Sequence, residues 1–203
     1  MKGTAVLSGT DIDLFISISE HCTETLQDIY EKLFRRLKER GYSPKRQNVS
    51  INIKVGSYSV DLVPAKRQNS VNSDHSLYRC RVQSWTKTNV LTHISHVVGA
   101  GRQQETRVIK LWRNQKNIDF PSFYLELVVI RALSGWNAMS TSLDSRVQTV
   151  FEYLRDHFPD ARFVDPANTN NVVSDDLTVV QKKAISTAAR AARAEPYWEG
   201  IVR

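Results

Sequence analysis

Residues 8–19 read Ser8-Gly-Thr-Asp-Ile-Asp-Leu-Phe-Ile-Ser-Ile-Ser19, and this stretch decides how the first half of the chain folds. Apolar residues recur at every second position, and successive side chains of a strand point to opposite faces of a sheet. The pattern therefore predicts a strand with Asp11 and Asp13 on one face and an aliphatic row on the other. The two carboxylates would lie side by side.

A second stretch, Val60-Asp-Leu-Val-Pro-Ala65, alternates in the same way and places Asp61 opposite an apolar face. If the two strands are neighbours in one sheet, Asp11, Asp13 and Asp61 converge on one surface. Close carboxylates repel each other, and a hard divalent cation held by oxygen ligands relieves the repulsion. The pattern indicates a Mg²⁺ or Mn²⁺ site for phosphoryl transfer. Taken alone, the Asp-x-Asp pair also fits a solvated strand edge.

Composition bounds the class of protein. The 203 residues are 41% apolar, which is enough for a folded core, and the net charge of +7 favours anionic partners such as nucleotides or nucleic acid. The two cysteines, Cys22 and Cys80, have no metal-ligand or redox spacing, which fits a reducing compartment. With no long apolar run and no leader pattern, we expect a cytoplasmic protein without a membrane span.

The first half predicts a small mixed sheet with one crossover helix. Helical spacing of apolar residues covers residues 23–40 and stops at Gly41. Residues 49–63 alternate on both sides of Gly56-Ser57, which predicts a hairpin. Residues 66–76 are expected to form a loop, and residues 77–82 a short strand.

The second half predicts a helical lobe, so the fold class is α+β. Apolar residues recur at helical spacing around Trp112, which we expect in the core. An irregular segment is expected at residues 163–172, and a last helix at residues 177–195. We expect two domains, residues 1–90 and residues 91–203.

Two blocks of sequence resemble a known superfamily. Lys2-Gly-Thr-Ala-Val-Leu-Ser-Gly-Thr-Asp-Ile-Asp-Leu-Phe15 followed by Val60-Asp-Leu-Val-Pro-Ala65 is similar to the catalytic core of polymerase-β-type nucleotidyltransferases. Arg107-Val-Ile-Lys-Leu-Trp-Arg113 followed by Pro121-Ser-Phe-Tyr-Leu-Glu126 resembles a signature of one branch. That branch contains cyclic GMP-AMP synthase, oligoadenylate synthase and the bacterial cyclic-oligonucleotide synthases. Both blocks occur here in the family's order.

The resemblance implies a role for each matching residue. Asp11 and Asp13 would bind both metal ions, and Asp61 would bind the catalytic ion and help to deprotonate the attacking hydroxyl. Lys110 and Ser122 would hold the donor triphosphate, as a compact cation and a hydroxyl donor. Without the resemblance, Lys110 fits the polar face of its helix, and Ser122 fits a helix N-cap after Pro121.

The resemblance implies a Mg²⁺-dependent enzyme that joins nucleoside triphosphates, ATP among them, into a cyclic or short linear oligonucleotide. In bacteria such a product is a second messenger of antiphage defence that acts on an effector protein. One alternative is an RNA-terminal nucleotidyltransferase, but the chain is short for a long RNA groove. The other alternative is a catalytically silent nucleotide-binding or interaction module.

Two features depart from the family pattern. A Gly-Ser dipeptide at the start of a helix normally precedes the Lys-Gly-Thr-like stretch, and its backbone amides grip the triphosphate. The sequence given begins at Met1, after the position of that element. Three explanations are open: the start is assigned too late, the sequence is shortened, or the protein is a degenerate member of the family. We therefore expect little activity from the 203 residues and recovery on upstream extension. Asn89 stands where the branch often has proline.

Other side chains with chemistry fit structural roles better. His93 and His96 lie one helical turn apart, but no third ligand is near in sequence, so we expect structural histidines. The basic residues Lys182, Lys183, Arg190, Arg193 and Arg203 fit a solvated helix face, with a contact to RNA or product as the alternative.

Overall fold

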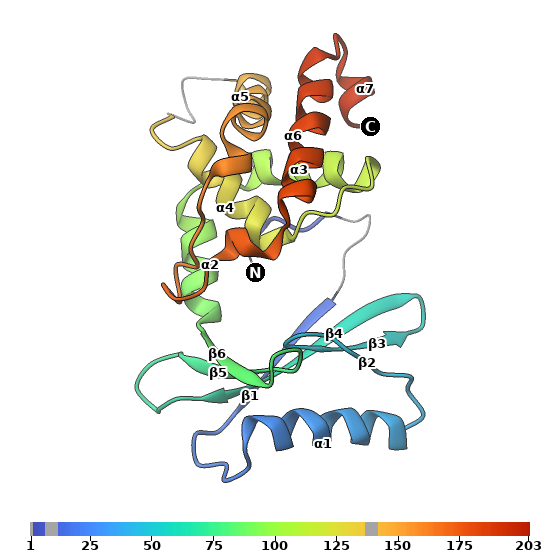
Figure 1. The fold of residues 1–203 in the computed structure, drawn as a ribbon, viewed down its shortest axis with the longest axis vertical. Coiled ribbons are helices and arrows are strands. Elements are labelled where there is room, and N and C mark those ends of the chain that lie inside the picture. Colours follow the sequence, from blue (N-terminus) through green and yellow to red (C-terminus); the bar gives the residue numbers. More distant parts are fainter. Residues whose placement is uncertain (1, 7–11, 137–141) are drawn as a thin grey trace. The chain divides into compact units, whose positions relative to one another are not determined.

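The computed structural model describes residues 2–6, 12–136 and 142–203. The chain divides into two compact units, which we call the sheet unit (residues 10–93) and the helical unit (residues 1–9 and 94–203). The boundary falls within helix α2 (Val90–Gly99). The sheet unit contains a mixed sheet and one long helix, and the helical unit contains the remaining helices (Figure 1). The predicted α+β class is confirmed.

Strand β4 is the centre of the sheet. It pairs in parallel with β1 along one edge and in antiparallel fashion with β3 and then β5 along the other. β2 and β6 extend the sheet beyond β3 and β5. The strands are β1 (Ile12–Ile18), β2 (Lys45–Arg46), β3 (Ile51–Val55), β4 (Tyr58–Arg67), β5 (His75–Arg79) and β6 (Ser84–Thr88).

Helix α1 (Leu26–Glu39) lies along one face of this sheet (Figure 1). It begins with a capping box, in which the Thr25 side chain and Asp28 satisfy each other's backbone N–H groups. Tyr30 and Phe34 are buried in a cluster with residues of β3 and β5. The Tyr30 hydroxyl donates to the carbonyl oxygens of Gln47 and Ser50 at 3.0 and 2.9 Å. The predicted crossover helix is therefore present and is fixed to the sheet.

The hairpin between β3 and β4 turns where the sequence predicts it. Val55 and Tyr58 are paired across the two-residue turn, and Gly56 has a φ of 59°, which favours glycine.

The predictions for the next segment were partly wrong. β4 runs on to Arg67, into the expected loop. The expected strand at residues 77–82 is instead β5, which ends at Arg79, and a turn at Gln83 leads into the unpredicted strand β6. β6 is an edge strand with no buried residue, so its sequence carries no apolar alternation.

The helical unit has one large hydrophobic core. Trp112 is fully buried, as predicted, and its ring meets that of Phe151 edge to face at 5.1 Å. Phe120, Tyr124 and Phe158 form a second aromatic group in the same core. The helices are α3 (Gln103–Gln115), α4 (Ser122–Ala132), α5 (Leu143–Asp156), α6 (Val179–Ala194) and α7 (Trp198–Ile201), with short 3₁₀ turns at Phe158–Asp160 and Val173–Asp176.

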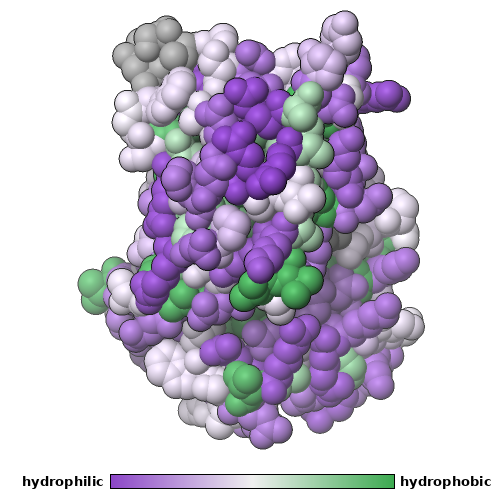
Figure 2. All heavy atoms as spheres, turned by 45° about the horizontal axis from the view of Figure 1, so that its top comes forward, coloured by the Kyte–Doolittle hydropathy of each residue, from purple (hydrophilic) through white to green (hydrophobic). Residues whose placement is uncertain are grey.

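The surface is mainly polar. On the face shown in Figure 2, hydrophilic side chains predominate and apolar ones occur in small groups. Within the described ranges, no helix has both the length and the hydropathy that a membrane crossing requires.

Candidate active site

Asp13 and Asp61 occupy matching positions on two paired parallel strands. They are direct partners in the register of β1 and β4, so their side chains leave the sheet on the same face. Val60 and Leu62, the neighbours of Asp61, are buried in a cluster with residues of α1. The two aspartates therefore lie on the face opposite α1. Asp13 is exposed and Asp61 is half-buried, so both carboxylates are within reach of a ligand from solvent.

Two amide side chains contact Asp61. Asn52, its register partner on β3, donates to Asp61 Oδ1 at 2.6 Å, and Gln47 donates to the same oxygen at 3.2 Å. Asn52 also donates to Ser59 Oγ at 2.8 Å, which fixes the orientation of its amide. Both donors are neutral, so they orient the carboxylate without cancelling its charge. Sequence reasoning missed both amides. Asn52 could have been found, because it lies between the buried Ile51 and Ile53 and so points to the face that carries Asp61.

The donor set fits a hard divalent cation. Asp13 and Asp61 offer carboxylate oxygens on adjacent strands, the ligand type that Mg²⁺ and Mn²⁺ prefer. The third expected ligand, Asp11, lies outside the described residues. Among the residues that are described, no group of three or more His, Cys, Asp or Glu side chains is placed to hold a metal ion. The assignment of all three aspartates therefore stays a prediction.

Lys110 lies on α3 in the helical unit and is buried, with 6% of its surface exposed. Its ammonium group donates to Glu126 Oε1 at 2.7 Å and to Thr4 Oγ1 at 3.2 Å. The same carboxylate accepts from the Thr4 hydroxyl at 2.6 Å and from Lys2 Nζ at 2.9 Å. Glu126 thus connects the N-terminal segment with α3 and α4. Lys110 does not lie on a solvated helix face.

The charges of this cluster shift one another's pKa values. Burial alone would raise the pKa of Glu126, but the ammonium groups of Lys2 and Lys110 more than offset burial and hold the pKa below its usual value. Burial lowers the pKa of Lys110, and the Glu126 carboxylate opposes that shift. Burial also lowers the pKa of the Arg113 guanidinium. The Glu126 carboxylate is therefore the group that opposes the effect of burial on Lys110.

Ser122 is the exposed first residue of α4. The N-cap position belongs to Pro121, and no side chain caps this helix. Ser122 Oγ accepts a hydrogen bond from Arg113 at 2.9 Å, and Arg113 also donates to the Phe120 carbonyl at 2.8 Å. The N-cap alternative is therefore wrong. Sequence reasoning missed Arg113, although it follows Lys110 by three residues on α3 and so shares its face.

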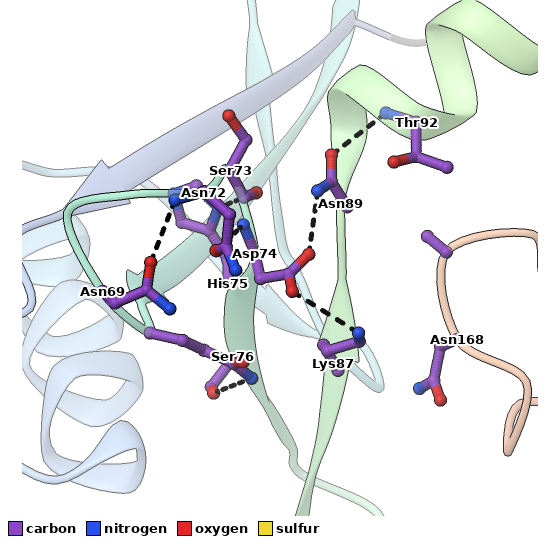
Figure 3. Close-up of polar contacts among 12 residues, drawn as sticks. Asn69, Asn72, Ser73, Asp74, His75, Ser76, Lys87, Asn89, Thr92 and Asn168 are labelled. Atoms are coloured by element: carbon purple, nitrogen blue, oxygen red, sulfur yellow. Dashed lines mark hydrogen bonds and ion pairs between the residues drawn. The ribbon is translucent and has the colours of Figure 1, made fainter.

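A polar cluster on the sheet unit fixes the start of α2 (Figure 3). The Asp74 carboxylate accepts from Asn89 at 2.8 Å and pairs with Lys87 at 3.5 Å. The Asn89 side chain in turn accepts from the Thr92 backbone N–H at 3.0 Å. Asn89, which departs from the family pattern, thus caps the first turn of this helix.

Comparison with known proteins places this fold. No protein-family profile matches the chain, and no curated protein matches it closely in sequence. Solved structures do match. The CdnC:HORMA-deltaN complex of Escherichia coli MS115-1 matches with a TM-score of 0.74 and 24% identity, over 98% of this chain and 78% of that one.

Two further matches come from other bacteria. Bradyrhizobium diazoefficiens CD-NTase CdnG in complex with GTP matches at a TM-score of 0.72 and 14% identity, over 95% of this chain and 74% of that one. The Vibrio cholerae DncV cyclic AMP-GMP synthase matches at 0.66 and 12% identity, over 91% of this chain and 56% of that one. The chain therefore has the fold of these bacterial CD-NTase structures, which is the fold that the sequence resemblance implies.

Proposed function

We propose that this protein is a divalent-metal-dependent nucleotidyltransferase that joins nucleoside triphosphates into a cyclic or short linear oligonucleotide and releases pyrophosphate. The register pairing of Asp13 with Asp61 on the accessible face of a CD-NTase fold carries the proposal. Structural neighbours support the substrate class, since one is described in complex with GTP and another as a cyclic AMP-GMP synthase.

Asp11, Asp13 and Asp61 are the residues that would hold Mg²⁺ or Mn²⁺ in this reaction. Such ions lower the pKa of an attacking hydroxyl and neutralise charge on the triphosphate. Asn52 and Gln47 fix the orientation of the Asp61 carboxylate through hydrogen bonds to Oδ1. It is therefore suited to accept the proton of a hydroxyl placed next to it.

Lys110 and Ser122 would contact the donor triphosphate. The ammonium group supplies charge, and the hydroxyl, oriented by Arg113, supplies a hydrogen bond. We further propose that the product is a second messenger that acts on an effector protein in antiphage defence.

Product analysis of the purified protein tests the proposal. The protein is incubated with the four labelled nucleoside triphosphates and Mg²⁺ or Mn²⁺, and products are resolved by mass. We expect a metal-dependent oligonucleotide and pyrophosphate, both absent in Asp61→Asn and retained in Asp160→Asn, which alters an exposed aspartate of the helical unit. Nucleotide binding without any product would instead favour the silent module, and lengthening of an added RNA would favour the RNA-terminal enzyme.

A further inference from the structure

Glu126 holds two lysines on one carboxylate. Lys110 binds Oε1 at 2.7 Å and Lys2 binds Oε2 at 2.9 Å, although they come from segments far apart in sequence. The Glu126 side chain is 3% exposed, so no solvent competes for these contacts. The two ammonium groups are thereby held near each other, one on each oxygen of the same carboxylate.

The hydrogen-bond capacity of the two lysines is not used up. An ammonium group has three N–H donors. Among the residues that the structure describes, Lys110 uses two of them, on Glu126 and Thr4, which leaves one. Within the same residues Lys2 uses one, on Glu126, which leaves two. The Thr4 hydroxyl accepts from Lys110 and donates to Glu126, so it has no further proton to offer.

The cluster also carries excess positive charge. Lys2, Lys110 and Arg113 each interact electrostatically with Glu126 or with Lys110. Among these four described residues, three cations share one carboxylate. Partly desolvated cations without enough counter-charge are unfavourable, and an anion that binds them removes that cost. A phosphate with several anionic oxygens has the complementary charge.

Exposure decides which lysine such an anion meets first. The Lys2 side chain is 25% exposed, and that of Lys110 is 8% exposed. The Lys2 ammonium also lies over the ring of Phe123, 4.5 Å from its centre, which limits the positions the side chain can adopt. Lys2 is therefore the accessible and oriented cation of the pair.

We propose that Lys2 contacts the donor triphosphate directly, and that Glu126 is a positioning residue that holds Lys2 and Lys110 together as a two-lysine phosphate clamp. This inference rests on the proposed function and extends it to residues that the family resemblance did not assign.

The test is binding of inorganic tripolyphosphate to the purified protein, measured by titration calorimetry. This probe has no base or sugar, so it reports the phosphate contact alone. Lys2→Met should weaken binding about tenfold, the equivalent of one charge-assisted hydrogen bond. The matched control is Lys183→Met, an exposed lysine of α6 in the same unit, which should bind as the wild type does. Lys2→Arg keeps the charge and should retain most of the affinity. Equal binding by Lys2→Met and Lys183→Met, or no binding by the wild type, overturns the inference.

The role of Glu126 is tested by a pH profile. Glu126→Gln keeps the shape of the side chain but removes the charge that opposes the burial-induced lowering of the Lys110 pKa. The charged groups around Lys110 are then Lys2 and Arg113, both cations. Tripolyphosphate affinity should therefore be lost at a lower pH in Glu126→Gln than in the wild type. A purely structural role would lower the melting temperature and leave the midpoint of the pH profile in place, which would refute the positioning role.

The experiments separate this inference from the proposed function. If the wild type makes oligonucleotides and Lys2→Met does so with unchanged KM, the clamp is refuted and the function stands. If the wild type makes no product but Lys2→Met loses tripolyphosphate affinity, the function is refuted and the phosphate contact stands.

Discussion

Removal of one partner from the Lys110 and Glu126 pair should destabilise the helical unit, and the two removals should differ in size. The pair is 2.7 Å long, with side chains 8% and 3% exposed. Breaking a buried ion pair costs about 3–5 kcal/mol, because the remaining charge stays buried. Glu126→Leu leaves the Lys110 ammonium with the Thr4 hydroxyl and should reach about 4 kcal/mol, within that range. Lys110→Met leaves Glu126 bonded to Lys2 and Thr4, so its cost should be about 2 kcal/mol.

The double variant separates the pair energy from the packing of its members. With neither charge buried, Lys110→Met with Glu126→Leu should cost far less than the sum of the single changes. The measurement is urea unfolding at pH 7 followed by circular dichroism, arranged as a double-mutant cycle. Arg193→Met is the matched control, since its ion pair with Glu152 is similarly short, at 2.8 Å, but has side chains 39% and 43% exposed. It should cost no more than about 1 kcal/mol.

Two results would refute this reasoning. Additive single changes would mean that the two charges do not stabilise each other. A Lys110→Met variant less stable than Glu126→Leu would mean that Lys2 and Thr4 do not support the carboxylate.

Three further predictions follow from other parts of the structure. Asp61→Asn should abolish oligonucleotide synthesis without lowering the melting temperature, since the change removes a charge that faces Asp13 but keeps the volume; product formed at the wild-type rate would exclude Asp61 from the reaction. Phe151→Ala should cost about 3–5 kcal/mol of unfolding free energy in urea titrations, because the fully buried ring packs against Trp112, and a loss below 1 kcal/mol would contradict that packing. Burial raises the pKa of Tyr30 to about 12 from an ordinary 10.0, so its contribution to stability is complete below pH 10 and is lost as pH rises through 12. The urea midpoint should fall more steeply above pH 10 in the wild type than in Tyr30→Phe, and parallel curves would count against this.

The central strands could be predicted because each carries its own evidence. Apolar residues of β1 and β4 pack against α1 on one face, so they recur at every second position around the aspartates, and Asp13 and Asp61 share the other face. The alternation could not show that these two strands are neighbours, because pairing partners are set by the whole sheet. Apolar alternation also could not predict β6, because none of its residues is buried.

The cationic cluster shows a second limit of sequence reasoning. Lys110 and Ser122 are recognisable because they belong to one short block of sequence. The contact of Glu126 with Thr4 spans 122 residues, and nothing local to either residue predicts it. The resemblance assigns Lys110 and Ser122 as two contacts to phosphate, whereas the structure pairs Lys110 with a buried carboxylate that opposes the lowering of its pKa. Residue type indicates the chemistry of a site, but long-range contacts decide which groups remain available for a ligand.

The charges of the two sites also favour one ligand class over another. The sheet unit places the Asp13 and Asp61 carboxylates on adjacent strands, and the Asp61 contacts with Asn52 and Gln47 are to neutral amides, so this site suits a cation. The cluster around Glu126 carries more cations than anions, so it requires a polyanion. An RNA backbone spreads one negative charge over each nucleotide, and it matches a cluster of two lysines on a single carboxylate less well than three linked phosphates do. We therefore expect the cluster around Glu126 to bind a triphosphate more tightly than RNA.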